Sequence, residues 1–73
     1  MTTIERVGAA HASAQLLHAT LTQFSLETVD PISKQMYQEL ANAAQSIAQG
    51  IRKRQQQLTD REGAIAQVRQ PEI

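Results

Sequence analysis

The chain has 73 residues, a formal net charge of zero and no cysteine, and only 3% of its residues are aromatic. A chain of this length forms one domain at most, and with no cysteine it has no disulfide to compensate for a thin core. The neutral charge balance excludes a global field that attracts nucleic acid or anionic lipid. We therefore expect association with further copies of the chain to complete the core.

The composition also indicates where the protein acts. No run of the sequence approaches the roughly 18 apolar residues that are needed to span a bilayer. Residues 1–6 lack the basic and apolar segments of a signal peptide. We therefore expect a cytoplasmic protein with no membrane span.

The first predicted element is a helix over residues 3–27. Thr2 and Glu5 have the spacing of a capping box, in which each side chain accepts a backbone N–H of the other residue. Apolar residues then recur at alternating steps of three and four, which is typical of one apolar stripe along a helix. Leu16 and Leu26 lie off this stripe and are candidates for contact with another subunit.

The link between the two predicted helices is marked by Asp30 and Pro31. An aspartate carboxylate can accept the free N–H groups of a first helical turn, so Asp30 is predicted to be the N-cap of the next helix. Proline already has a helical φ and loses no hydrogen bond at the first helical position, so Pro31 is predicted to begin that helix. The result is an antiparallel hairpin with a link of about three residues.

The second predicted helix covers residues 31–69 and is much longer than the first. Folding at the link is expected to place Leu21 against Tyr37, and Val7 against Ile51. Residues beyond about Lys53 then have no cover within the chain, and we expect residues 56–73 to overhang or to be partly disordered. The overhang contributes further candidates for contacts between subunits: Leu58, Ile65 and Val68.

Both stripes together predict a hairpin core that is buried in every assembly, strongest at Leu17, Leu21, Leu40 and Ile47. The full predicted core comprises Val7, Ala14, Leu17, Leu21, Phe24, Tyr37, Leu40, Ala44, Ile47 and Ile51. The predicted architecture is thus all-α: a single helical-hairpin domain over residues 1–73 that assembles into an oligomeric helical bundle.

Side chains with catalytic or ligand-binding chemistry are sparse. His11 and His18 are seven residues apart, which puts their backbones roughly 10 Å apart, too far to share a metal without a third element. The serines and carboxylates stand singly, no phosphate-binding glycine loop occurs, and no cofactor or small-molecule substrate is indicated. The chain is predicted not to be an enzyme.

The one basic cluster is Arg52, Lys53 and Arg54, to which Arg61 adds a further cation. Successive helical residues fan over about 200°, so these side chains do not form a flat patch, and no aromatic residue lies nearby to stack on bases. We interpret the cluster as a solvated helix surface. A weak nucleic-acid site remains the alternative.

The segments 21–30 and 33–37 resemble an uncharacterised family of short two-helix proteins from endospore-forming bacteria, catalogued as domain of unknown function 1657. Family members have a Leu-rich first helix that ends in a Leu-Glu-Thr-like turn and a second helix with an Ala-Lys-x-x-Tyr-like start, followed by an Ala/Gln/Ile stretch and an arginine. Residues 43–47 and Arg54 occupy those last places here. The chain departs from the family at residues 60–69, where relatives tend to have an acidic tail.

This resemblance implies a sporulation or spore-germination setting, because genes of the family tend to lie beside those of spore membrane channel components. It implies no catalytic or binding residues, and it makes the developing spore a possible location. The first hypothesis is a non-enzymatic helical interaction protein, acting as a homo-oligomer or as an adaptor for an unidentified protein partner. The alternatives are a small nucleic-acid-associated protein and a helical-hairpin export chaperone.

Overall fold

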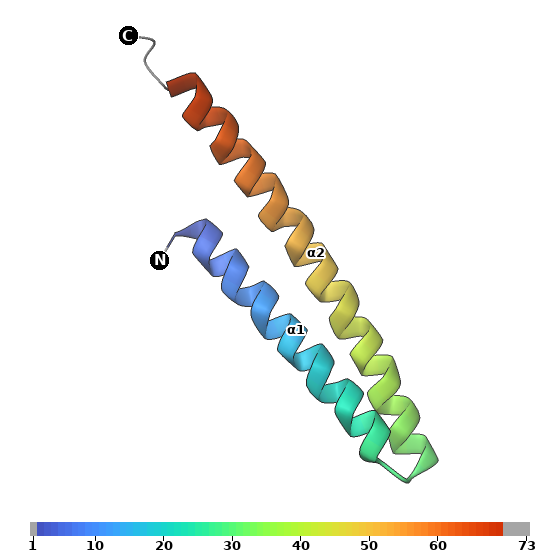
Figure 1. Cartoon of the computed structure of the whole chain (residues 1–73). Helices are drawn as coiled ribbons and strands as arrows, with labels where there is room; N and C mark the ends of the chain where they lie inside the picture. The colour runs from blue at the N-terminus through green and yellow to red at the C-terminus, as the bar shows by residue number, and fades with distance from the viewer. Residues whose placement is uncertain (1, 70–73) are drawn as a thin grey trace.

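The chain folds into an antiparallel hairpin of two helices, shown in Figure 1. The computed structural model describes the backbone of residues 2–69 and the side chains of residues 2–61. Helix α1 spans Thr3–Glu27 and helix α2 spans Pro31–Arg69, which are the bounds that the sequence predicts. The described part is an elongated rod with extents of 67 × 18 × 14 Å. Helix α2 continues well past the start of α1 (Figure 1).

Local side-chain hydrogen bonds begin each helix. The Glu5 backbone N–H donates to Thr2 Oγ1 at 3.1 Å and the Thr2 N–H donates to Glu5 Oε2 at 3.3 Å, so the predicted capping box is present. Asp30 caps α2, since its Oδ2 accepts the backbone N–H of Ser33 at 2.9 Å and the Ser33 hydroxyl at 2.6 Å. These two bonds hold the pKa of Asp30 below its usual range, because they favour the ionised carboxylate.

The helices meet along a seam of buried and half-buried residues that alternate at steps of three and four. On α1 and its C-cap the seam comprises Ile4, Val7, His11, Ala14, His18, Leu21, Ser25 and the C-cap Thr28; on α2 it comprises Lys34, Tyr37, Ala41, Ala44, Ala48, Ile51, Gln55 and Leu58. Its most buried members are small: Ala14, Ser25, Ala41, Ala44 and Ala48, each at most 8% exposed. Small side chains let two helices approach closely but bury little apolar area each, so the hairpin has a thin core.

The prediction that every large apolar residue of the two stripes is buried in the hairpin is wrong for four of them. Leu17, Phe24, Leu40 and Ile47 are 44–56% exposed. The remaining predicted core residues are buried or half-buried: Val7, Ala14, Leu21, Tyr37, Ala44 and Ile51. The physical reason is the rotation of each helix about its own axis. The centre of each apolar stripe points roughly 50° away from the other helix, so only one edge of the stripe lies in the seam.

The predicted register is also wrong, by about one helical turn. Tyr37 packs edge-on against Phe24, with ring centroids 5.6 Å apart, and Phe24 lies three residues beyond the predicted partner Leu21. At the other end, Gln55 reaches Gly8, whereas the prediction pairs Val7 with Ile51. Thr28 is extended and carries the chain past the end of α1 before α2 begins (Figure 1). This shift brings more of α2 alongside α1, and Leu58, expected to overhang, is half-buried.

Candidate interaction surface

Five of the nine exposed large apolar side chains in the described part of the chain lie on one flank of the hairpin. Leu17 and Phe24 each precede a seam residue of α1, and Leu40 and Ile47 each precede a seam residue of α2. In an antiparallel pair of right-handed helices, residues with the same offset from the seam lie on the same side. We call this surface the apolar flank: Ala10, Leu17, Phe24, Met36, Leu40, Ala43 and Ile47, all of which are exposed.

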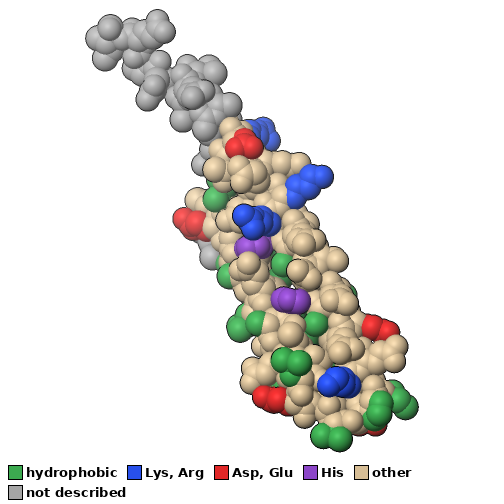
Figure 2. All heavy atoms as spheres, turned by 45° about the vertical axis from the view of Figure 1, so that its right-hand side comes forward, with side chains coloured by type: hydrophobic (Ala, Val, Ile, Leu, Met, Phe, Trp, Pro, Cys, Tyr) green, Lys and Arg blue, Asp and Glu red, His purple; other side chains and the backbone are tan. Residues whose placement is uncertain are grey.

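The opposite flank carries residues that follow the seam, and it is polar. A groove of about 220 Å³ runs there between the helices, lined by His11, Gln15, His18, Gln45, Ala48, Gln49 and Arg52. Figure 2 shows histidine side chains on this face, surrounded mainly by polar side chains and backbone, with hydrophobic side chains also in view. Residues that follow a seam residue, such as Gln15 on α1 and Gln49 on α2, line the same groove, so these positions of both helices lie on one side of the hairpin. The apolar flank lies on the other side.

His18 connects the two helices within this groove. Its Nδ1–H donates to the backbone carbonyl of Ala41 at 2.7 Å, so the ring is held with Nε2 free of the helix backbone. The structure places both His11 and His18 half-buried on the seam. Their seven-residue spacing, in phase with Ala14 and Leu21, is the signal that could have indicated this role.

The side chains around the polar groove are not arranged as a metal site in the described part of the chain. No group of three or more histidine, aspartate or glutamate side chains within residues 2–61 is placed to hold a metal ion. The enclosed hydroxyls nearby bond to their own helix: Thr22 donates to the His18 carbonyl at 2.8 Å and Ser25 donates to the Thr22 carbonyl at 2.6 Å. Neither hydroxyl is therefore paired with a base.

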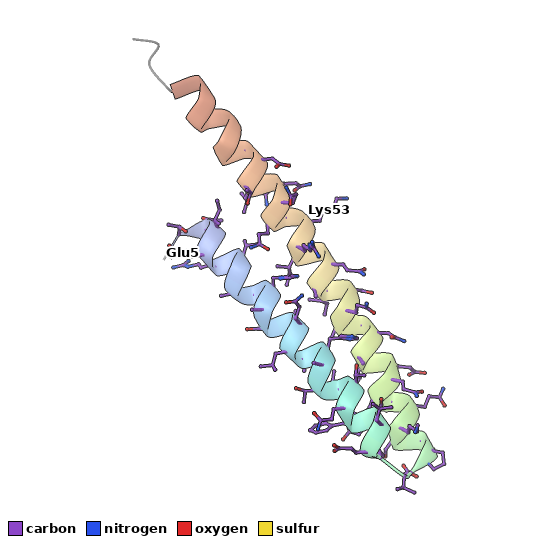
Figure 3. All side chains as sticks on the ribbon, in the orientation of Figure 1. Glu5 and Lys53 are labelled. Atoms are coloured by element: carbon purple, nitrogen blue, oxygen red, sulfur yellow. The ribbon has the colours of Figure 1, made fainter. Side chains whose placement is uncertain are left out.

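The basic residues diverge around α2, as their spacing predicts. Arg52 lines the polar groove and Lys53 points away from α1 (Figure 3), although both border one shallow hollow on α2. Arg54 donates from Nη1 to Gln57 Oε1 at 3.3 Å, and Arg61 is exposed further along the helix. The four cations thus do not form one surface.

The other candidates for contacts between subunits have different environments. Leu16 is 69% exposed and Leu26 is 74% exposed, both away from the apolar flank. Leu26 instead borders a second hollow on the polar side, with Thr22 and Gln38 among its neighbours. The side chains of Ile65 and Val68 lie outside those that the structure describes. In the described part of the chain, neither helix has a stretch long and apolar enough to cross a membrane.

Comparison with known proteins identifies a protein family but no individual relative or solved structure. A family model described as a protein of unknown function (DUF1657) matches residues 7–54, the segment that contains most of the seam and the whole apolar flank. Neither the curated proteins nor the solved structures provide a match. Because the family model covers well over half of the sequence, the chain belongs to this family of unknown function, DUF1657.

Proposed function

We propose that this protein is a non-enzymatic helical interaction protein that self-associates through its apolar flank. The observation that supports the proposal is that small side chains are buried while large apolar side chains are exposed, the reverse of the usual pattern in a protein core. The residues most buried in the hairpin are alanines and one serine, whereas leucine, isoleucine, methionine and phenylalanine side chains remain about half exposed. Contiguous exposed apolar surface of this kind marks protein contact sites in soluble proteins.

The proposal extends to the setting in which the assembly acts. The resemblance to proteins of endospore-forming bacteria supports a role in sporulation or spore germination, in the cytoplasm or within the developing spore. There the assembled bundle acts directly or serves as an adaptor for a protein partner. A pull-down from the native host with a tagged chain identifies such a partner, and a single dominant client would instead favour the export-chaperone hypothesis.

Two structural features favour an interaction role over the alternatives. The basic side chains diverge around α2, so they cannot together follow a phosphate backbone, which disfavours a nucleic-acid site. The enclosed hydroxyls of Thr22 and Ser25 are engaged with backbone carbonyls rather than activated by a base, which disfavours nucleophilic catalysis.

Sedimentation velocity over a range from about 1 to 100 μM tests self-association directly. We expect a concentration-dependent shift from monomer to a discrete assembly, with thermal unfolding that shifts to higher temperature as the concentration rises. A monomer at every concentration that nevertheless unfolds cooperatively would contradict the proposal, because the hairpin would then be stable without cover for its apolar flank.

A further inference from the structure

We infer that the apolar flank binds the same flank of a second copy, in a two-fold symmetric dimer in which the two hairpins run in opposite directions. The inference rests on the proposed self-association and adds the partner's orientation and the contact surface. Surface area, helix rotation, the position of the large side chains and the distribution of charge all support it.

The accessible surface of the chain matches what a dimer needs to bury. The chain exposes 5894 Å², whereas a compact monomer of 8.1 kDa is expected to expose about 4,500 Å². The excess is about 1,400 Å², and a standard stable interface buries about 800 Å² on each partner. Part of this excess belongs to the segment of α2 that extends past α1, and the rest leaves room for one face-to-face contact along the rod.

The apolar stripes of both helices point in the direction that they would take in a four-helix bundle. In an isolated pair of helices, the centre of each stripe should face the other helix. Here one edge of each stripe forms the seam, for example Leu21 and Tyr37, and the other edge, for example Leu17 and Leu40, is exposed. In a bundle each helix contacts two neighbours, so its stripe points between them toward the bundle axis. A second hairpin on the apolar flank supplies the two missing neighbours.

The large side chains are placed so that the flank is complementary to itself when reversed. Leu40 and Ile47 flank Ala43 on α2 at three and four residues, and Leu17 and Phe24 flank Thr20 on α1 with the same spacing. A two-fold axis near Ala43 brings Leu40 of one copy to the level of Ile47 of the other. An isologous interface requires this self-complementarity. Ala43, which is small and exposed, allows the copies to approach closely at the axis.

The charges favour the reversed orientation over the parallel one. Glu27 and Asp30 lie at the closed end of the hairpin, while Arg6 and Arg54 lie toward the open end, and all four are exposed. Arg54 follows Ile47 by seven residues and Glu27 follows Phe24 by three, so both border the apolar flank. Reversal brings Arg54 to the level of the carboxylates of the other copy. A parallel dimer would place the two Arg54 side chains at the same level along the rod, where like charges repel.

Distance measurements between spin labels distinguish the two orientations, and the natural absence of cysteine makes single labelling clean. Ile32→Cys, Ser46→Cys and Lys53→Cys place labels at exposed positions spaced by multiples of seven on one side of α2; Figure 3 labels Lys53. Reversal about Ala43 separates each label pair along the axis by about 3 Å per residue from Ala43, since each copy contributes a rise of about 1.5 Å. The axial separations are then about 33, 9 and 30 Å, a long–short–long series.

Equal distances at all three positions, in a sample that sediments as a dimer, would overturn the reversed orientation and leave self-association intact. A monomer in sedimentation would instead contradict the proposed function itself. To test the contact surface, Leu40→Gln is added to the Ser46→Cys chain and should remove the dipolar coupling, whereas Leu26→Gln, on the opposite flank, should preserve it. The reverse result would place the interface on the polar side and overturn the inference.

Discussion

Replacing one leucine of the apolar flank should weaken the assembly without unfolding the helices. Leu17 is 51% exposed in the hairpin, so about half of its burial free energy of roughly 1.5–3 kcal/mol is still available to an interface. A two-fold dimer loses that half twice, which amounts to about 1.5–3 kcal/mol of association free energy. At 1.4 kcal/mol per factor of ten, Leu17→Gln should raise the dimer Kd roughly 10- to 100-fold.

The adjacent residue provides a matched control. Leu16 is the same residue type on the same helix and is 69% exposed, but it lies off the apolar flank. Sedimentation equilibrium of Leu16→Gln should give an unchanged Kd, and far-UV circular dichroism should show equal helicity for both variants above their Kd. If Leu16→Gln weakens the dimer and Leu17→Gln does not, assembly uses the outer face of α1 and the reasoning from the apolar flank is wrong.

Three further changes test the hairpin itself. Asp30→Ala should lower the unfolding temperature at pH 7, and the difference should disappear as pH falls through the depressed pKa of Asp30, below about 3.9, because only the ionised carboxylate accepts both Ser33 bonds. Gly50→Ala should stabilise the monomeric hairpin by about 1 kcal/mol in chemical denaturation, since a Cβ there meets nothing within 4 Å of its own chain; a destabilised monomer would contradict that open environment. His18→Ala should cost about 1 kcal/mol more than His11→Ala, because His18, and not His11, donates a hydrogen bond to the other helix among the described side chains; equal losses would contradict that role.

Local sequence signals were sufficient to predict the two helices and their bounds. The capping box at Thr2 and Glu5 and the Asp30-Pro31 pair each act over a single turn, so their effect does not depend on what packs against the helix. The spread of the basic residues around α2 follows in the same way from 100° per residue.

Only the tertiary structure decided which side of each apolar stripe faces the other helix. Periodicity identifies a stripe some 100° wide, but it does not specify whether the partner helix meets its centre or its edge. Ala41 and Ala48 were missed because alanine is common on every face of a helix, yet their small size allows the close contact that His18 completes. Leu17 and Leu40 were predicted to be buried in the hairpin and are left exposed, because close packing of small residues along the seam turns the larger ones toward a surface that one chain alone cannot cover.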